Sequence, residues 1–103
     1  MVAINEKIEK LKRIVQEYKF LNLKISKLDC IGNLMNSIVR LIPKSKYVYL
    51  DVGTSGYYLI DKDLSVYNIK AYGQKGYFKG NIDMVIEEYQ EKIKFMYKRE
   101  GYD

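Results

Sequence analysis

Histidine and tryptophan are missing from this chain of 103 residues, which has one cysteine and one proline. Without histidine, proton transfer near neutral pH needs a carboxylate, lysine, tyrosine or cysteine whose pKa is shifted. Nucleophile elbows, Walker loops and paired-cysteine metal motifs are missing as well. We therefore expect a protein that is not an enzyme and has no cofactor, metal or small-molecule substrate.

Long apolar runs are also missing. No stretch approaches the ~20 apolar residues that a membrane-spanning helix needs. The first ten residues, MVAINEKIEK, carry charges where a signal peptide has its apolar region. The lone Cys30 cannot form a disulfide within the chain, and its neighbours Leu28 and Ile31 favour a small buried residue. These absences predict a cytoplasmic protein with no membrane partner.

The composition that is present fits one small globular domain. Hydrophobic residues make up 48% of the chain and charged residues 30%, which excludes a disordered protein. A chain of 103 residues is enough for one domain and not for two. So small a domain buries a modest fraction of its surface, which favours stabilisation by a second copy. We expect a single domain over residues 1–103 and a homodimer.

The positive charge is unevenly distributed. The formal net charge is +5, and a basic protein suits anionic partners such as nucleic acid. Residues 1–46 hold ten Lys/Arg against four Asp/Glu, a net +6, whereas residues 47–103 hold eight against nine, a net −1. The excess therefore precedes the region that is expected to form a sheet.

Two helices are predicted in the N-terminal half. Residues 3–28 have the periodicity of an amphipathic helix, with Asn5 as its N-cap. Leu21, Leu23 and Ile25 also alternate with polar neighbours as in a strand, but no turn interrupts the stripe, so we favour helix. A second helix is predicted between Leu34 and Ile42, because its residues are apolar over a wide arc. Pro43 ends it, since the residue before proline resists helical geometry.

A small antiparallel sheet is predicted next, in the region that holds seven of the eleven tyrosines. Its strands run over about 47–52, 57–61 and 65–72, separated by the turns GTSG and DKD, with a short Tyr77-Phe78 segment after GQKG. In the first strand, Val48, Leu50 and Val52 share one face. The inward face of the second strand stays open, because Tyr58/Ile60 and Tyr57/Leu59 are both apolar. In the third, we expect Tyr67, Ile69 and Ala71 inside and Asn68, Lys70 and Tyr72 outside.

The last helix is predicted to begin after Asn81, its N-cap, and to end at Gly101. Its acidic residues come early and its basic residues late, which complements the helix dipole. The expected fold class is α+β: two N-terminal helices, a three-stranded antiparallel sheet with a short fourth segment, and a C-terminal helix packed on one sheet face.

Acidic residues offer two weak catalytic or metal patterns. Asp61-x-Asp63 is similar to the start of a calcium loop, but position six is Val66 instead of glycine and position twelve is Tyr72 instead of glutamate. The aspartates at 51, 61, 63 and 83 have no spacing that argues for a magnesium site. Surface and turn carboxylates are the better interpretation of both patterns.

The outer sheet face and the glycine loop are the candidate nucleic-acid surface. Aromatic rings stack on bases at about 1–3 kcal/mol per base, and lysines hold phosphates. RRM domains place bases on a sheet in this way, although the element order here differs from theirs. The two GxxG strings lie beside strands, so they do not match the KH loop, which joins two helices. The residues predicted to bind DNA or RNA are Tyr49, Lys70, Tyr72, Lys75 and Lys79.

Two other interpretations remain open. Exposed strand tyrosines are good strand formers, and a second subunit can cover them, since tyrosine is favoured at interfaces. The long first helix can also project and pair with its copy as a short coiled coil. Either arrangement describes a protein–protein adaptor or minor structural protein that forms a homodimer.

The segment YYLIDKDLSVYNIKAYGQKGYFKGNI, residues 57–82, resembles a strand–turn–strand module with a basic glycine loop found in small virus and phage proteins. The composition, rich in Ile, Lys and Tyr and free of His, is similar to that of small uncharacterised proteins of crenarchaeal viruses. The resemblance implies a viral or mobile-element protein from a hyperthermophile, located in the host cytoplasm. It implies no mechanism and no functional residue.

Overall fold

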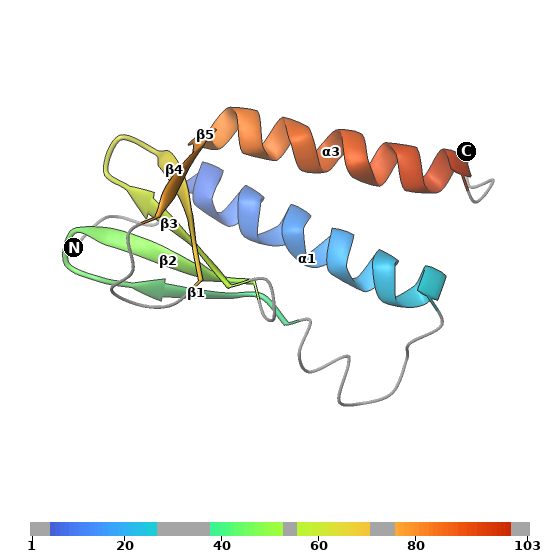
Figure 1. The fold of residues 1–103 in the computed structure, drawn as a ribbon, viewed down its shortest axis with the longest axis horizontal. Helices are drawn as coiled ribbons and strands as arrows, with labels where there is room; N and C mark the ends of the chain where they lie inside the picture. Colours follow the sequence, from blue (N-terminus) through green and yellow to red (C-terminus); the bar gives the residue numbers. More distant parts are fainter. Residues whose placement is uncertain (1–4, 27–37, 53–55, 71–75, 100–103) are drawn as a thin grey trace.

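A computed structural model describes residues 5–26, 38–52, 56–70 and 76–99, which form two helices and one five-stranded sheet (Figure 1). Helix α1 spans Glu6–Ser26 and helix α3 spans Ile82–Arg99. The strands are β1 Arg40–Pro43, β2 Tyr47–Asp51, β3 Tyr57–Asp61, β4 Ser65–Ile69 and β5 Tyr77–Asn81. The α+β class is confirmed, with five strands instead of three.

The sheet is a simple antiparallel meander in which each strand pairs with the next along the chain, in the order β1-β2-β3-β4-β5. Its strands are short and joined by tight connections. For example, the Asp61 carboxylate accepts hydrogen bonds from the backbone N–H groups of Asp63 and Ser65, at 3.0 and 2.9 Å. This side chain fixes the β3–β4 turn that the DKD sequence predicts.

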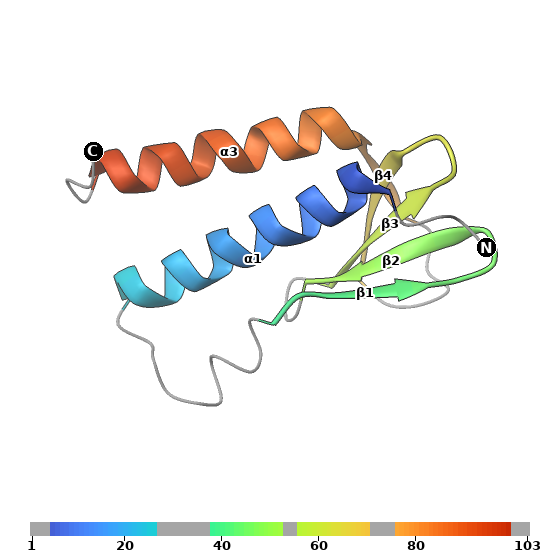
Figure 2. The same ribbon diagram turned by 180° about the vertical axis from the view of Figure 1, so that it is seen from behind.

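Both helices cover the same face of the sheet, and they run side by side in the same direction until they extend past it (Figures 1 and 2). The apolar stripe of α1 places Ile8, Leu11 and Val15 in the core with almost no exposed surface. From the sheet, Val48, Leu50 and Val52 face them, as predicted, and β3 adds Tyr58 and Ile60. The structure thereby settles the inward face of β3.

Side chains cap the N-termini of both helices as the sequence predicts. Asn5 Oδ1 accepts a hydrogen bond from the backbone N–H of Ile8 at 3.0 Å, and Asn81 Oδ1 accepts one from Met84 at 3.0 Å. Each cap satisfies a donor that the first turn of a helix leaves without an intrahelical partner. The predicted end of α3 at Gly101 lies outside the described residues, as do Cys30 and residues 27 and 28.

The predicted second helix is wrong at its C-terminal end, where Arg40–Pro43 form the edge strand β1 instead. Leu41 pairs with Leu50 and Ile42 with Tyr49, so this short apolar run gains a hydrogen-bonded partner strand that the sequence does not reveal. Pro43 is tolerated because an edge strand leaves one row of backbone groups unpaired. Of the rest of that prediction, residues 38 and 39 are described and are not helical, and residues 34–37 lie outside the described part of the chain.

The predicted faces of the third strand are reversed. Val66 is completely buried under the helices and pairs with Ile60, whereas Tyr67 and Ile69 point to the other side of the sheet. Asn68 pairs with the core residue Tyr58 and so lies on the helix-covered face. The pattern misleads because the open face of β4 carries both Tyr67 and Ile69, whereas Val66 shares the covered face with the polar Asn68, so the more apolar side of this strand is not the inward one.

Candidate nucleic-acid interface

The sheet face opposite the helices carries one continuous row of apolar side chains. Ile42 pairs with Tyr49, Tyr49 with Leu59, Leu59 with Tyr67, and Tyr67 with Phe78. Directly paired residues of a sheet point to the same face, so each of the five strands contributes one member. With strands about 4.8 Å apart, the row is roughly 19 Å long. We call these five residues the open-face row.

Aromatic rings on this face pack edge to face. The ring centroids of Tyr49 and Tyr47 are 5.3 Å apart, those of Tyr49 and Tyr57 are 6.3 Å apart, and those of Tyr67 and Phe78 are 5.6 Å apart. Tyr49 is surrounded so completely that it is only 5% exposed. The rings that remain accessible are therefore those of the half-buried Tyr47, Tyr57 and Tyr67 and the exposed Phe78.

Gly76, directly before β5, packs its backbone against side chains of the open face. A Cβ atom at Gly76 would lie 2.5 Å from Cγ2 of Ile69 and 3.1 Å from Cβ of Tyr67. Because these side chains fill the space where a larger residue would project, the chain that enters β5 runs directly against them. Ile69 is consequently buried although no helix covers it.

The charges around the open-face row are mostly positive. The described sheet region, residues 38–52, 56–70 and 76–81, holds six Lys/Arg against three Asp, a net +3. Arg40, opposite Asp51 on the open face, and Lys70 lie at one end of the strands. Lys44, Lys46 and Lys62 lie in the turns at the other end. The open-face row therefore has cations on both sides. Arg40, Lys44 and Lys46 belong to the segment that the sequence pattern assigned to a helix and its exit loop.

Of the five predicted nucleic-acid residues, the three that the structure describes do not come together as a group. Tyr49 lies on the open face as predicted, but its neighbours bury it. Lys70 is exposed directly after β4. Tyr72 and Lys75 fall outside the described residues, so the structure gives no account of them.

Lys79 is misplaced by the prediction, which puts it in a flexible loop. It is the extra residue of a β-bulge in β5, since Val66 pairs with Gly80 and Tyr67 with Phe78. Its ammonium lies 3.5 Å from a Glu88 carboxylate oxygen and 5.7 Å above the centre of the Tyr58 ring. Both partners belong to the helix-covered side, so Lys79 and Tyr49 lie on opposite faces of the sheet.

Sequence reasoning missed Tyr57, Tyr67 and Phe78 as members of the open face, and Arg40 beside them. The signal that finds them is strand register, because the row becomes visible only when the pairs are known. Alternation within each strand does not reveal it, since Tyr58 and Ile60 are as apolar as Tyr57 and Leu59.

On the helix-covered side, two tyrosines form the polar link between sheet and helix. The hydroxyl oxygens of Tyr58 and Tyr89 lie 2.5 Å apart in a buried hydrogen bond. Burial, reinforced by this bond, raises the pKa of Tyr89 far above the ordinary tyrosine value. Lys92 stacks its ammonium over the ring of Tyr89 at 5.2 Å and over that of Tyr18 at 5.7 Å. Each hydroxyl is the hydrogen-bond partner of the other, so the pair links α3 to β3 inside the core.

Two further charged groups are shifted by their surroundings. Burial lowers the pKa of the Lys19 ammonium, which donates a hydrogen bond to the Val52 carbonyl, while the Asp51 carboxylate opposes that shift. Burial by itself raises the pKa of Glu88, but its contacts with Lys92 and Lys79 outweigh burial and hold the pKa below its ordinary value. Neither group belongs to a cluster of reactive side chains.

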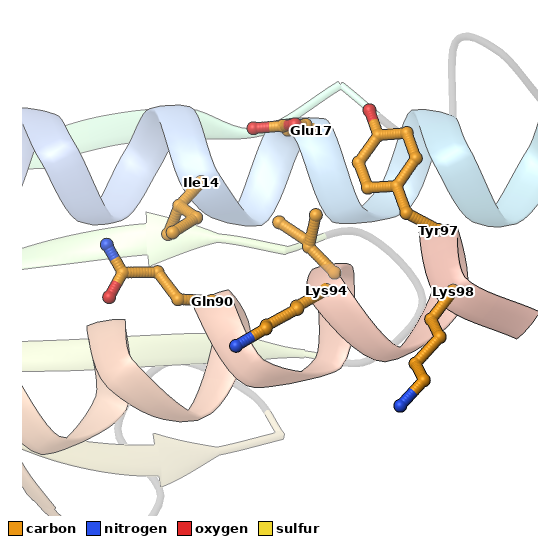
Figure 3. A pocket seen from close by; sticks show the side chains of 7 residues that line it. Ile14, Glu17, Gln90, Lys94, Tyr97 and Lys98 are labelled. Carbon is orange, nitrogen blue, oxygen red and sulfur yellow. The ribbon is translucent and has the colours of Figure 1, made fainter. Parts of the chain in front are cut away.

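A groove of about 640 Å³ lies between α1 and α3, with Ile14 and Ile93 among its apolar lining residues. Figure 3 shows Lys94 and Lys98 on α3 with their ammonium groups directed away from α1. Because the polar groups do not converge, the groove has no point at which they would hold a ligand together.

Two kinds of site are not found in the part of the chain that the structure describes. No three acidic or cysteine side chains there gather closely enough to hold a metal ion. Neither described helix is long and apolar enough to cross a membrane.

No protein-family model matches the chain, and neither the curated proteins nor the solved structures contain a significant match.

Proposed function

We propose that this chain is a non-enzymatic protein that binds single-stranded nucleic acid across the open face of its sheet. The observation that carries the proposal is the open-face row, which crosses all five strands on the face that no helix covers. Aromatic rings on a strand surface are a general platform for bases, because every base has a face that can stack.

The accessible rings supply the stacking. Tyr57 and Tyr67 occupy adjacent strands, and Phe78 extends the series to the edge strand β5. Each base stacked on such a ring contributes about 1–3 kcal/mol, whatever its identity. Tyr49 contributes indirectly, since its buried ring supports those of Tyr47 and Tyr57.

The cations supply the attraction to phosphate. A strand of nucleic acid that follows the row has Arg40 and Lys70 on one side and Lys44, Lys46 and Lys62 on the other. A chain of phosphates gains from such flanking charges through the release of its counterions. Among the residues that the structure describes, no helix or ribbon projects from this face, so it suits a flexible single strand better than the grooves of a duplex.

Fluorescence anisotropy with a labelled oligothymidylate, repeated over a salt series, tests the proposal. We expect binding at low salt that weakens steadily as salt rises. Replacing both accessible rings of the row, Tyr67→Ala with Phe78→Ala, should weaken binding at least about 30-fold, since two stacked bases lose about 1 kcal/mol or more each. Arg40→Gln or Lys70→Ala should flatten the salt slope by about 0.7 each, the value for one lost phosphate contact on a single strand.

Phe95→Ala is the matched control. Phe95 and Phe78 are each 65% exposed, but Phe95 lies near the far end of α3, away from the sheet. We expect its loss to leave binding unchanged. No binding at low salt, or equal losses from Phe95→Ala and from the double variant at 67 and 78, would overturn the proposal.

A second candidate function is supported by a different observation. Tyr77 and Phe78 leave large aromatic surfaces exposed at one edge of the sheet, which suits contact with another protein chain. This exposed aromatic surface favours the homodimer.

A further inference from the structure

The two edges of the sheet differ in how they are protected. The outer strand β1 is four residues long and ends with exposed Arg40 and Pro43, both of which oppose pairing with another strand. The outer strand β5 instead exposes Tyr77 and Phe78, at 82% and 65%. Among the described strands, β5 pairs only with β4, so its second side has no strand partner there.

We propose that a second copy of this chain pairs with β5, antiparallel and edge to edge, about a two-fold axis that passes beside Phe78. The two sheets then become one continuous sheet of ten strands. The inference goes beyond nucleic-acid binding and does not depend on it, since it concerns the edge of the sheet and not its open face.

Self-complementarity selects this register. A two-fold axis at Phe78 places Phe78 opposite Phe78 and Tyr77 opposite Lys79 of the other copy. Aromatic cross-strand pairs stabilise a sheet, and a lysine beside a tyrosine ring is attracted to it. An axis at Lys79 would instead place Phe78 opposite Gly80, which has no side chain to pack against the ring.

The neighbouring surface supports the same arrangement on both faces. On the open face, Phe78 is the last member of the open-face row, so the paired copies form one uninterrupted row of ten apolar side chains. On the helix-covered side, Met84 is exposed and lies next to Gly80, 3.6 Å from where a Cβ atom there would be. Pairing through β5 brings two such methionines towards the axis, where they add apolar contact.

The bulge at Lys79 does not prevent this pairing. A bulge or an inward-pointing lysine often protects an edge strand. Here Glu88 and the Tyr58 ring of the same copy hold the Lys79 side chain over the helix-covered side. The edge beside Phe78 therefore carries no charged group of its own.

Sedimentation equilibrium measures the proposed dimer directly. We expect the wild-type chain to be a dimer at micromolar concentration. Phe78→Asp should raise its dissociation constant at least about 30-fold, because it places two carboxylates opposite each other at the centre of the contact. Phe95→Asp, at an equally exposed phenylalanine on α3, should leave the dimer intact. Circular dichroism checks that each variant is folded.

Disulfide formation tests the register. In a Cys30→Ser background, Phe78→Cys should form a covalent dimer rapidly on mild oxidation, because directly opposed residues have Cα atoms about 4.5–5.5 Å apart, a separation that a disulfide spans. Phe95→Cys should not. A wild-type chain that stays monomeric, or a Phe95→Cys variant that links as fast as Phe78→Cys, would overturn the proposal.

Tyr77→Lys separates this inference from the proposed function. It places lysine opposite Lys79 of the other copy and leaves the open-face row untouched, so it should produce a folded monomer. That monomer should still bind oligothymidylate, with about half the number of nucleotides covered per complex. A wild-type chain that is a dimer but does not bind oligothymidylate would contradict the proposed function alone. A wild-type chain that binds oligothymidylate as a monomer would contradict the dimer alone.

Discussion

The two faces of the sheet are both apolar, but they are built from different residues. Under the helices lie aliphatic side chains such as Val48, Leu50 and Ile60, with no exposed surface. On the open face lie the rings of Tyr47, Tyr57 and Tyr67, which are half-buried.

The difference reflects what lies above each face. Branched aliphatic residues fill the closely packed space between sheet and helix and need no polar partner. Tyrosine combines a large apolar ring with a hydroxyl that water can satisfy, so it suits a face that is exposed for part of the time. Figure 1 shows both helices on one side only, which leaves the ring-bearing side as the one available for binding.

The largest expected difference in stability is between alanine variants of two neighbours in β3, Ile60 and Leu59, which point to opposite faces of the sheet. Ile60→Ala should lower the free energy of unfolding by about 3 kcal/mol, because it leaves a cavity in a fully buried site. Leu59→Ala should cost roughly 1 kcal/mol, because its half-buried neighbours and water can fill the space. Urea denaturation of both variants measures the difference, and equal losses would show that the open face is as tightly packed as the core.

A smaller difference in stability is expected between variants that remove one tyrosine hydroxyl from each face of the sheet. Tyr58→Phe should cost about 1–2 kcal/mol, because it leaves the buried Tyr89 hydroxyl without its partner. Tyr67→Phe keeps the ring that packs on Phe78 and should change stability by less than about 0.5 kcal/mol.

A double-mutant cycle isolates the buried bond from other effects of substitution. Adding Tyr89→Phe to Tyr58→Phe should recover part of the loss, because no polar group is then left unsatisfied. Strictly additive losses in the cycle would show that the two hydroxyls do not interact.

The smallest effect concerns Glu88 and pH. The pKa of Glu88 is lower in the folded chain than in the unfolded one, so ionised Glu88 stabilises the fold above the unfolded value, near 4.5. That contribution is lost as pH falls through the lower, folded pKa. The stability difference between wild type and Glu88→Gln should therefore be present at pH 6 and shrink below pH 4 in thermal melts. A difference that grows in acid would contradict this assignment.

Local signals in the sequence were enough to predict most elements of the fold. The helical stripe that contains Ile8, Leu11 and Val15, and the caps Asn5 and Asn81, predict α1 and the start of α3, because a helix is stabilised by contacts between residues close in sequence. The turn residues around β2, β3 and β4 likewise mark where those strands begin and end.

Features that depend on partners distant in sequence were not predictable. The strand β1 forms because Leu41 and Ile42 pair with β2, and the open-face row appears only once the registers of all four strand pairs are known. The predicted site accordingly contained Tyr49 from the open face and Lys70 from the end of β4, missed Tyr57, Tyr67 and Phe78, and included Lys79 from the opposite side. Where both faces of a strand are apolar, alternation cannot decide which one the helices cover.

We infer that nucleic acid binds on the open face of the sheet and not on the helices. Backbone amide NMR spectra recorded during titration with unlabelled oligothymidylate test it residue by residue. We predict that the largest shifts fall on the open-face row and its neighbours, at Tyr57, Leu59, Tyr67 and Phe78, while amides of α1 and α3 move little. Shifts confined to the two helices, or no shifts at low salt, would contradict the claim.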